Sequence, residues 1–203
     1  MLIPGLVVGI VVFIYVRWFC EKEKAPLTKP WLISIIPVTI IVLGLIINQY
    51  GYSLIGLRYG FLASLLIAVT YIDLKLKIIP NQVIIVGFLA GIIFALNQPR
   101  YYLAGAITGF IFLLLIYLLS RGGIGEGDLK LALVIGLFLG YPLVAVSLIL
   151  TYLIGGVFFA GLLLLKKIKI KQEVAFGPYM ALGAVIAMIH GINIMKWYFG
   201  FVL

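Results

Sequence analysis

Residues 143–165 have the sequence LVAVSLILTYLIGGVFFAGLLLL, an uninterrupted apolar run without a charged side chain. A helix needs roughly 20 apolar residues to cross the hydrocarbon core of a bilayer, so this run is long enough to span a membrane. The whole chain has the same character, with 65% hydrophobic and 10% charged residues and a mean hydropathy of +1.30. Soluble domains are about half apolar and about a quarter charged, so the composition predicts an integral membrane protein.

Apolar runs divided by charged residues, glycines and prolines predict about eight membrane crossings. We expect them at 2–19, 31–48, 53–72, 81–97, 101–119, 129–141, 143–165 and 179–201. Because the runs are continuous, whereas barrel strands alternate over ~10 residues, we expect an all-α transmembrane helical bundle. The last run contains His190-Gly191-Ile192-Asn193, which would divide it into a span and an interfacial helix. No basic residue precedes the first run, so we expect it to be a retained span and not a signal peptide.

The basic residues, which give the chain a formal net charge of +9, predict how the bundle is oriented. Twelve fall on one side of the predicted membrane and three on the other. The larger group is Arg17, Lys22, Lys24, Lys29, Lys75, Lys77, Arg121, Lys130, Lys166, Lys167, Lys169 and Lys171, and the smaller is Arg58, Arg100 and Lys196. Since cytoplasmic loops carry the excess of lysine and arginine, we expect both termini to lie outside the cell.

No polar segment has a basic stripe with interleaved aromatics, so we expect contact with the lipid bilayer and not with nucleic acid.

Cys20 is the only cysteine of the chain and His190 is the only histidine. An intrachain disulfide is therefore excluded, and so is a zinc site built from cysteine and histidine. We expect the chain to need no metal ion and no organic cofactor.

Asp73 and Asp128 are the only aspartates, and each lies next to a long apolar run. A carboxylate beside a membrane span is costly, so both are candidates for a functional role. The predicted topology places them at the same face of the membrane, where neighbouring carboxylates could share a proton and activate a water, as in aspartic proteases. The alternatives are structural. Asp73 could pair with Lys75 or Lys77 at the interface, and Asp128 could cap a helix.

Glycine and proline flank both aspartates. Pro80 follows Asp73 and suits the start of the next helix, because proline fits a first turn. Gly125 and Gly127 precede Asp128. Glycine reaches backbone conformations closed to other residues and allows a second backbone, such as an extended substrate, to approach closely.

Three further features accompany the aspartates. Lys130 is the cation best placed to lower the pKa of Asp128, or it anchors a phosphate headgroup. Glu126 lies in the same glycine-rich loop, and we expect it to be a spectator. Gly177-Pro178 marks a rigid turn before the last run, which either shapes a substrate cleft beside the aspartates or only begins the helix.

Together these segments resemble the type IV prepilin peptidase family, which consists of polytopic membrane aspartic proteases of the GxGD class. The family pattern has an aspartate, basic residues and Ile-Pro-Asn, here Asp73 to Asn81. It continues with GxGD, a hydrophobic residue and a lysine, here Gly125 to Lys130, and later with Phe-Gly-Pro, here Phe176 to Pro178. The resemblance covers residues 55–190 and implies that Asp73 and Asp128 are the catalytic pair. The residues expected to bind substrate or to shape the site are Pro80, Gly125, Gly127, Lys130, Gly177 and Pro178.

The resemblance implies a single membrane peptidase domain, 1–203, with a catalytic core at 51–203. Its expected activity is removal of the short basic leader from type IV prepilin, pseudopilin or preflagellin-like precursors at the cytoplasmic face of the cell membrane. Many bacterial members have a large first cytoplasmic loop with two CxxC pairs, which is associated with methylation of the new N-terminus. Here residues 1–50 hold a shorter loop with one cysteine, so we expect no N-methyltransferase activity. The short loop also leaves open a resemblance to archaeal preflagellin peptidases.

Two other functions compete with the protease. The first is a proton-coupled transporter that uses Asp73 and Asp128 as a relay. Relay groups usually lie deep in a bundle, whereas these two are expected at one face, which favours the protease. The second is a non-catalytic membrane scaffold in which both aspartates are caps or interface charges.

Overall fold

The computed structural model describes residues 2–25, 28–120, 124–166 and 174–202, and within these ranges the regular elements are α-helices. They are α1 (Leu2–Lys22), α2 (Lys29–Ile33), α3 (Ile35–Tyr50), α4 (Leu54–Leu76), α5 (Asn81–Ala95), α6 (Pro99–Leu119), α7 (Glu126–Leu139), α8 (Leu143–Leu164) and α9 (Gly177–Val202). The predicted all-α bundle is confirmed. Seven of the eight predicted crossings fall on one helix each, and the predicted crossing 31–48 falls on α2 and α3.

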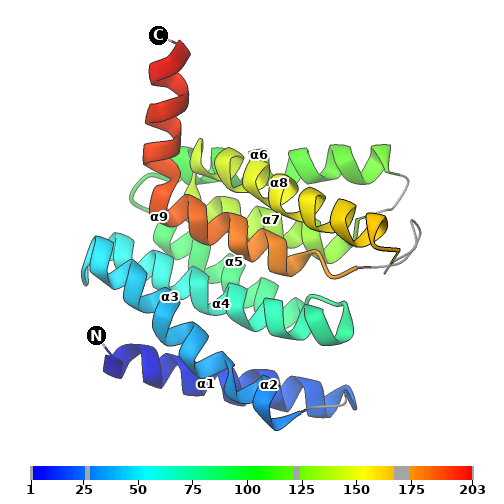
Figure 1. Ribbon diagram of the computed structural model, residues 1–203. Helices are drawn as coiled ribbons and strands as arrows, with labels where there is room; N and C mark the ends of the chain where they lie inside the picture. The colour runs from blue at the N-terminus through cyan, green and yellow to red at the C-terminus, as the bar shows by residue number, and fades with distance from the viewer. Residues whose placement is uncertain (1, 26–27, 121–123, 167–173, 203) are drawn as a thin grey trace.

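Six helical stretches of the described chain are long and apolar enough to cross a membrane. They are Ile3–Lys22, Lys29–Tyr50, Leu54–Leu76, Pro99–Leu119, Leu143–Leu164 and Gly177–Tyr198. With 15 and 14 residues, α5 and α7 are shorter than the roughly 20 residues of a straight crossing. Figure 1 shows the N- and C-termini at the same end of the bundle.

Figure 1 shows the helices side by side, with α1 and α3 at one edge, α4 in the middle, and α6 and α8 at the other edge. The first part of α9 lies between α4 and α8, and its red C-terminal part turns away from the bundle. The predicted division at His190 to Asn193 is not a gap between two helices, since α9 is continuous from Gly177 to Val202, although it changes direction along its length. The C-terminal end of α4 and the N-terminal ends of α7 and α9 reach the same end of the bundle (Figure 1).

The short helix α7 is enclosed by protein, which explains why its length does not match the bilayer. All its residues from Val134 to Leu139 are buried. It packs closely on α6 because small residues face each other there: a Cβ atom on Gly105 would lie only 2.5 Å from the carbonyl oxygen of Gly136. Such small-residue contacts let helices of membrane proteins approach closely. The packing on α6 therefore fixes the position of α7 and of the residues at its N-terminus.

One of the three basic residues in the smaller group is buried in a helix. Arg58 belongs to α4 and is only 4% exposed. Its Nη2 donates to the carbonyl oxygen of Phe94 at 2.6 Å, in the last turn of α5, and its guanidinium lies 4.0 Å from the centre of the Tyr102 ring. The cation is held by these partners at the end of α5 and is not a solvated loop charge. Arg121, Lys167, Lys169 and Lys171 lie outside the described residues.

Candidate active site

Asp73 lies in the last turn of α4, where the first residues of α9 meet it. Its side chain is buried, with 4% exposure, and its Oδ2 accepts a hydrogen bond of 2.8 Å from the N–H of Gly177. The backbone N–H of Phe176 also interacts with this carboxylate. A buried carboxylate needs such donors, and the first N–H groups of a helix are available because they have no partner within the helix. Pro178 follows in the first turn of α9, a place where the missing N–H of proline costs nothing.

The chain leaves α4 sharply after Asp73. Lys77 ends the helix in a left-handed conformation, with φ of 55°, and its N–H donates to the carbonyl oxygen of Asp73 at 2.8 Å. Pro80 is buried and directly precedes the first residue of α5. The alternative in which Lys75 forms an ion pair with Asp73 is wrong, because Nζ of Lys75 lies over the ring of Trp31, 4.9 Å from its centre.

Asp128 is the third residue of α7 and is also buried, with 8% exposure. Its Oδ2 accepts a hydrogen bond of 3.2 Å from the N–H of Gly125, the residue at which the helix begins. The alternative in which Asp128 caps α7 is therefore correct in part. Gly125 occupies the capping position, and Asp128 reaches back to it from the third position, as in the second half of a capping box.

The structure brings the two aspartates to the same end of the bundle, close enough for one charge to affect the other. Burial, together with the negative charge of Asp73, raises the pKa of Asp128 to about 7, against an opposing effect of the Gly125 N–H. Two carboxyl groups that interact in this way titrate as a pair, and near neutral pH they hold one proton between them. That is the protonation state in which a carboxyl pair can supply an acid and a base at once.

Lys130 does not have the expected effect on Asp128. Its side chain is exposed, and the groups that act on the pKa of Asp128 are Asp73 and Gly125. Glu126 is likewise exposed. Among the described residues, no three His, Cys, Asp or Glu side chains lie close enough together to bind a metal ion.

The glycines of the site allow close packing, and their backbone angles are ordinary. Neither Gly125 nor Gly127 has a positive φ. A Cβ atom on Gly127 would lie 3.0 Å from Cβ of Ile79, in the segment that joins α4 to α5. A Cβ atom on Gly177 would lie 2.9 Å from Oδ2 of Asp73. Gly127 therefore lets the start of α7 approach the segment after Asp73, and Gly177 lets α9 approach Asp73 itself.

Tyr152 is a residue of this region that the sequence reasoning missed. It belongs to α8, and its ring lies 5.4 Å from that of Phe176 and 5.8 Å from that of Phe112, measured between ring centres. Asp128 acts on it electrostatically, and its hydroxyl oxygen is buried without a hydrogen-bond partner among the described residues. Tyr152 lies within the apolar run 143–165, where the sequence gives no sign that it differs from a packing aromatic.

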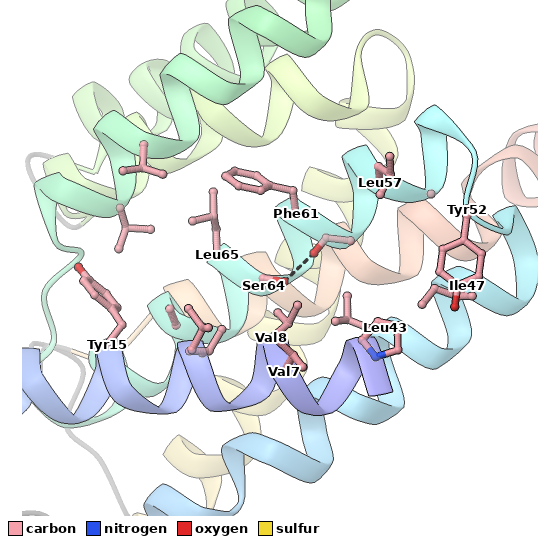
Figure 2. Close-up of a pocket in the computed structure, with 18 of the residues that line it drawn as sticks. Val7, Val8, Tyr15, Leu43, Ile47, Tyr52, Leu57, Phe61, Ser64 and Leu65 are labelled. Carbon is pink, nitrogen blue, oxygen red and sulfur yellow. Dashed lines mark hydrogen bonds between the residues drawn. The ribbon is translucent and has the colours of Figure 1, made fainter. Parts of the chain in front are cut away.

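An apolar groove of about 540 Å³ lies away from the aspartates, between α1, α3, α4 and the start of α5. Figure 2 shows Tyr15, Leu43, Phe61 and Ser64 among the residues that line it. Neither Asp73 nor Asp128 lines this groove, so we place the candidate chemistry at the aspartate pair.

Comparisons with known proteins match the part of the chain that contains Asp73 and Asp128 to a protein family. Residues 60–160 match the model described as the type IV leader peptidase family, a range that includes both aspartates. The chain is 33% identical over 160 residues to the prepilin leader peptidase/N-methyltransferase of Bacillus subtilis (strain 168), covering 72% of this chain and 64% of the relative. The protein of that name from Aeromonas salmonicida (strain A449) is 33% identical over 159 residues, covering 71% of this chain and 55% of the relative.

A third relative of that name, from Stutzerimonas stutzeri, is 23% identical over 209 residues, covering 96% of this chain and 70% of the relative. The chain thus spans less than two thirds of the length of the first two relatives, 64% and 55%. No solved structure matches the chain. These relatives do not favour the proton relay considered above, because their names describe a peptidase.

Proposed function

Since this chain belongs to the type IV leader peptidase family, we propose that it is a membrane-embedded aspartic endopeptidase. Its substrates are type IV prepilin-like precursors, from which it removes the short basic leader. The observation that carries the proposal is the pair of buried carboxyl groups, Asp73 from α4 and Asp128 from α7, of which Asp128 has a pKa of about 7. Such a pair is the equipment for general acid–base hydrolysis of a peptide bond.

The surroundings of the two aspartates favour different roles. With a pKa of about 7, Asp128 is the aspartate that carries the shared proton up to neutral pH. Asp73 is the ionised partner, because its carboxylate accepts hydrogen bonds from the N–H groups of Gly177 and Phe176. In the first step Asp73 takes a proton from the attacking water as the water oxygen bonds to the scissile carbonyl carbon. Asp128 gives its proton to the carbonyl oxygen, which becomes a hydroxyl. Collapse of this tetrahedral intermediate breaks the C–N bond, the leaving nitrogen takes the proton now on Asp73, and the hydroxyl returns its proton to Asp128.

The site is suited to a substrate that is half in the membrane. The apolar N-terminal helix of the precursor lies in the bilayer, and its basic leader stays in water beside the ends of α4 and α7. We assign this end of the bundle to the cytoplasm, since most of the lysine and arginine residues are expected there. The protein is then a multi-pass protein of the cell membrane, with its catalytic residues at the cytoplasmic face and its N- and C-termini outside.

We further infer that this chain does not methylate the new N-terminus of its product. Its relatives are named as N-methyltransferases as well as peptidases. In this chain the short connection between α1 and α3 carries no cysteine, and Cys20, the only cysteine, is buried in α1. The two cysteine pairs associated with methylation in many family members have no counterpart there. Mass spectrometry of a cleaved product checks this inference, since a methylated N-terminus would contradict it.

The proposed activity is tested by expressing a pilin-like precursor together with wild type, Asp73→Asn or Asp128→Asn. Loss of the leader is followed as a shift on a gel, and membrane insertion of each variant is checked by fractionation. We expect wild type to cleave and both variants to fail. Glu126→Gln is the matched control, because Glu126 is exposed, lies two residues from Asp128 and should be dispensable. Cleavage by either aspartate variant at the wild-type rate would refute the paired mechanism.

A further inference from the structure

Tyr152 places a buried hydroxyl inside an otherwise apolar part of the bundle. Among the described residues, this hydroxyl oxygen has less than 1 Å² of exposed surface and no hydrogen-bond partner. A buried polar atom without a partner is costly, because it has given up its hydrogen bonds to water and gained none in the protein. Such a group needs a reason, and a functional site is one of the places where an unpartnered polar atom is expected.

The neighbours of Tyr152 connect it to both aspartates. Its ring packs on Phe176, 5.4 Å away, and Phe176 directly precedes Gly177, whose N–H binds Asp73. Asp128 acts electrostatically on Tyr152. The ring also contacts Phe112 of α6, with 5.8 Å between the ring centres. Aromatic contacts thus hold Tyr152 against the segment whose N–H groups bind Asp73, and its hydroxyl is not bonded to either carboxylate.

We propose that Tyr152 is a further catalytic residue, whose hydroxyl donates a hydrogen bond to the scissile carbonyl oxygen of the substrate. This role rests on the proposed peptidase function. When water attacks, the electron pair of the carbonyl π bond moves onto that oxygen. Asp128 transfers its proton there, and Tyr152 donates a hydrogen bond to the same oxygen while keeping its own proton.

A donor without a ground-state partner is well suited to this task. An interaction accelerates a reaction only if it is stronger in the transition state than before it. In the described structure the hydroxyl of Tyr152 forms no bond that it would have to break, so its hydrogen bond is made with the oxygen as negative charge develops there. A preorganised donor in a buried site is worth far more than the same donor in water.

The test compares two tyrosines whose hydroxyls are equally buried and unpartnered within the described part of the chain, Tyr152 and Tyr15. Tyr152→Phe keeps the ring contacts and removes only the donor. We expect kcat for precursor cleavage to fall about 100-fold, as on removal of an oxyanion donor elsewhere, with KM nearly unchanged. Tyr15→Phe is the matched control, because Tyr15 lines the groove of Figure 2 and should leave both constants unchanged.

A second pair of variants separates a donor from a packing residue even if Tyr152→Phe is poorly folded. Incorporation of 4-aminophenylalanine at position 152 keeps a donor in nearly the same place, whereas 4-methylphenylalanine fills the space without one. We expect substantial cleavage with the first and a loss like that of Tyr152→Phe with the second. Equal cleavage with both, or wild-type kcat in Tyr152→Phe, would overturn the proposed role while the aspartate mechanism stands on its own variants. If wild type cleaves no prepilin-like precursor, the peptidase function and the role of Tyr152 fall together.

Discussion

Replacing Asp128 with asparagine should stabilise the folded protein much more at pH 8 than at pH 4.5. The pKa of Asp128 rises from its ordinary value of 3.8 to about 7 because the side chain is buried and lies near the charge of Asp73. The folded state therefore binds this proton more tightly than the unfolded chain does. The stability that this proton contributes is fully present below pH 3.8 and is lost as the pH rises through about 7.

The magnitude follows from the difference between the two pKa values. Each pKa unit corresponds to about 1.4 kcal/mol, so wild type should lose about 4 kcal/mol by pH 8 and only about 1 kcal/mol by pH 4.5, relative to strongly acidic solution. Asparagine has no charge to bury and keeps a carbonyl oxygen that can accept the N–H of Gly125. The gain of the variant over wild type should therefore grow by about 3 kcal/mol between the two pH values.

The assay is thermal unfolding in detergent, measured for wild type and Asp128→Asn at both pH values. A difference of about 3 kcal/mol corresponds to a shift of unfolding midpoint on the order of 10 °C for a chain of this size. Comparing the two proteins at each pH removes the contribution of the titrating groups that do not interact with Asp128. Glu126→Gln is the control, since its exposed side chain should give no such pH dependence. A gain that is the same at pH 4.5 and pH 8 would contradict this prediction, because it would mean that Asp128 is not protonated in the folded state.

Two further outcomes follow from the same geometry. The initial rate of precursor cleavage should fall as the pH rises above about 7, because Asp128 loses the proton that it must donate, and a flat rate from pH 6 to pH 8.5 would contradict that role. Gly177→Ala should lower kcat by roughly 10-fold or more, because its Cβ would lie 2.9 Å from Oδ2 of Asp73 and displace the carboxylate. Gly156→Ala, where no atom lies within 4 Å of the added Cβ, is its control and should cleave like wild type.

The helices could be predicted because their apolar runs have a direct physical cause. A backbone in lipid must satisfy its hydrogen bonds internally, so a long apolar run such as 143–165 is a helix wherever it lies in the bundle. The number of helices that cross the membrane is harder to predict than the positions of the helices. The run 129–141 is apolar because α7 is enclosed by other helices, and burial in protein gives the same composition as contact with lipid.

The two aspartates of the site could be predicted from the sequence, because burying a charged side chain in a membrane protein is costly. That cost singles out Asp73 and Asp128 from the sequence alone, and the structure places both side chains inside the protein. Of the two roles expected for Lys130, lowering the pKa of Asp128 is wrong, because closeness along the chain does not tell which way a side chain points. Anchoring of a phosphate headgroup stays a prediction. Tyr152 could not be singled out from the sequence, because the residues next to it in the fold are distant along the chain. They belong to α6, α7 and the segment before α9.

The positions of the aspartates at helix ends explain how two carboxyl groups can lie close together with unequal charge. Asp128 lies in the first turn of α7, where the helix dipole favours an anion, yet its pKa is raised, so burial and repulsion by Asp73 outweigh the dipole. Asp73 lies in the last turn of its own helix α4, where the dipole disfavours an anion. Its carboxylate accepts hydrogen bonds from the N–H groups of Phe176 and Gly177 at the start of α9, which favour its ionised form. The docking of α9 on α4 thus favours the negative charge on Asp73, and Gly177 is the residue whose small size permits that docking.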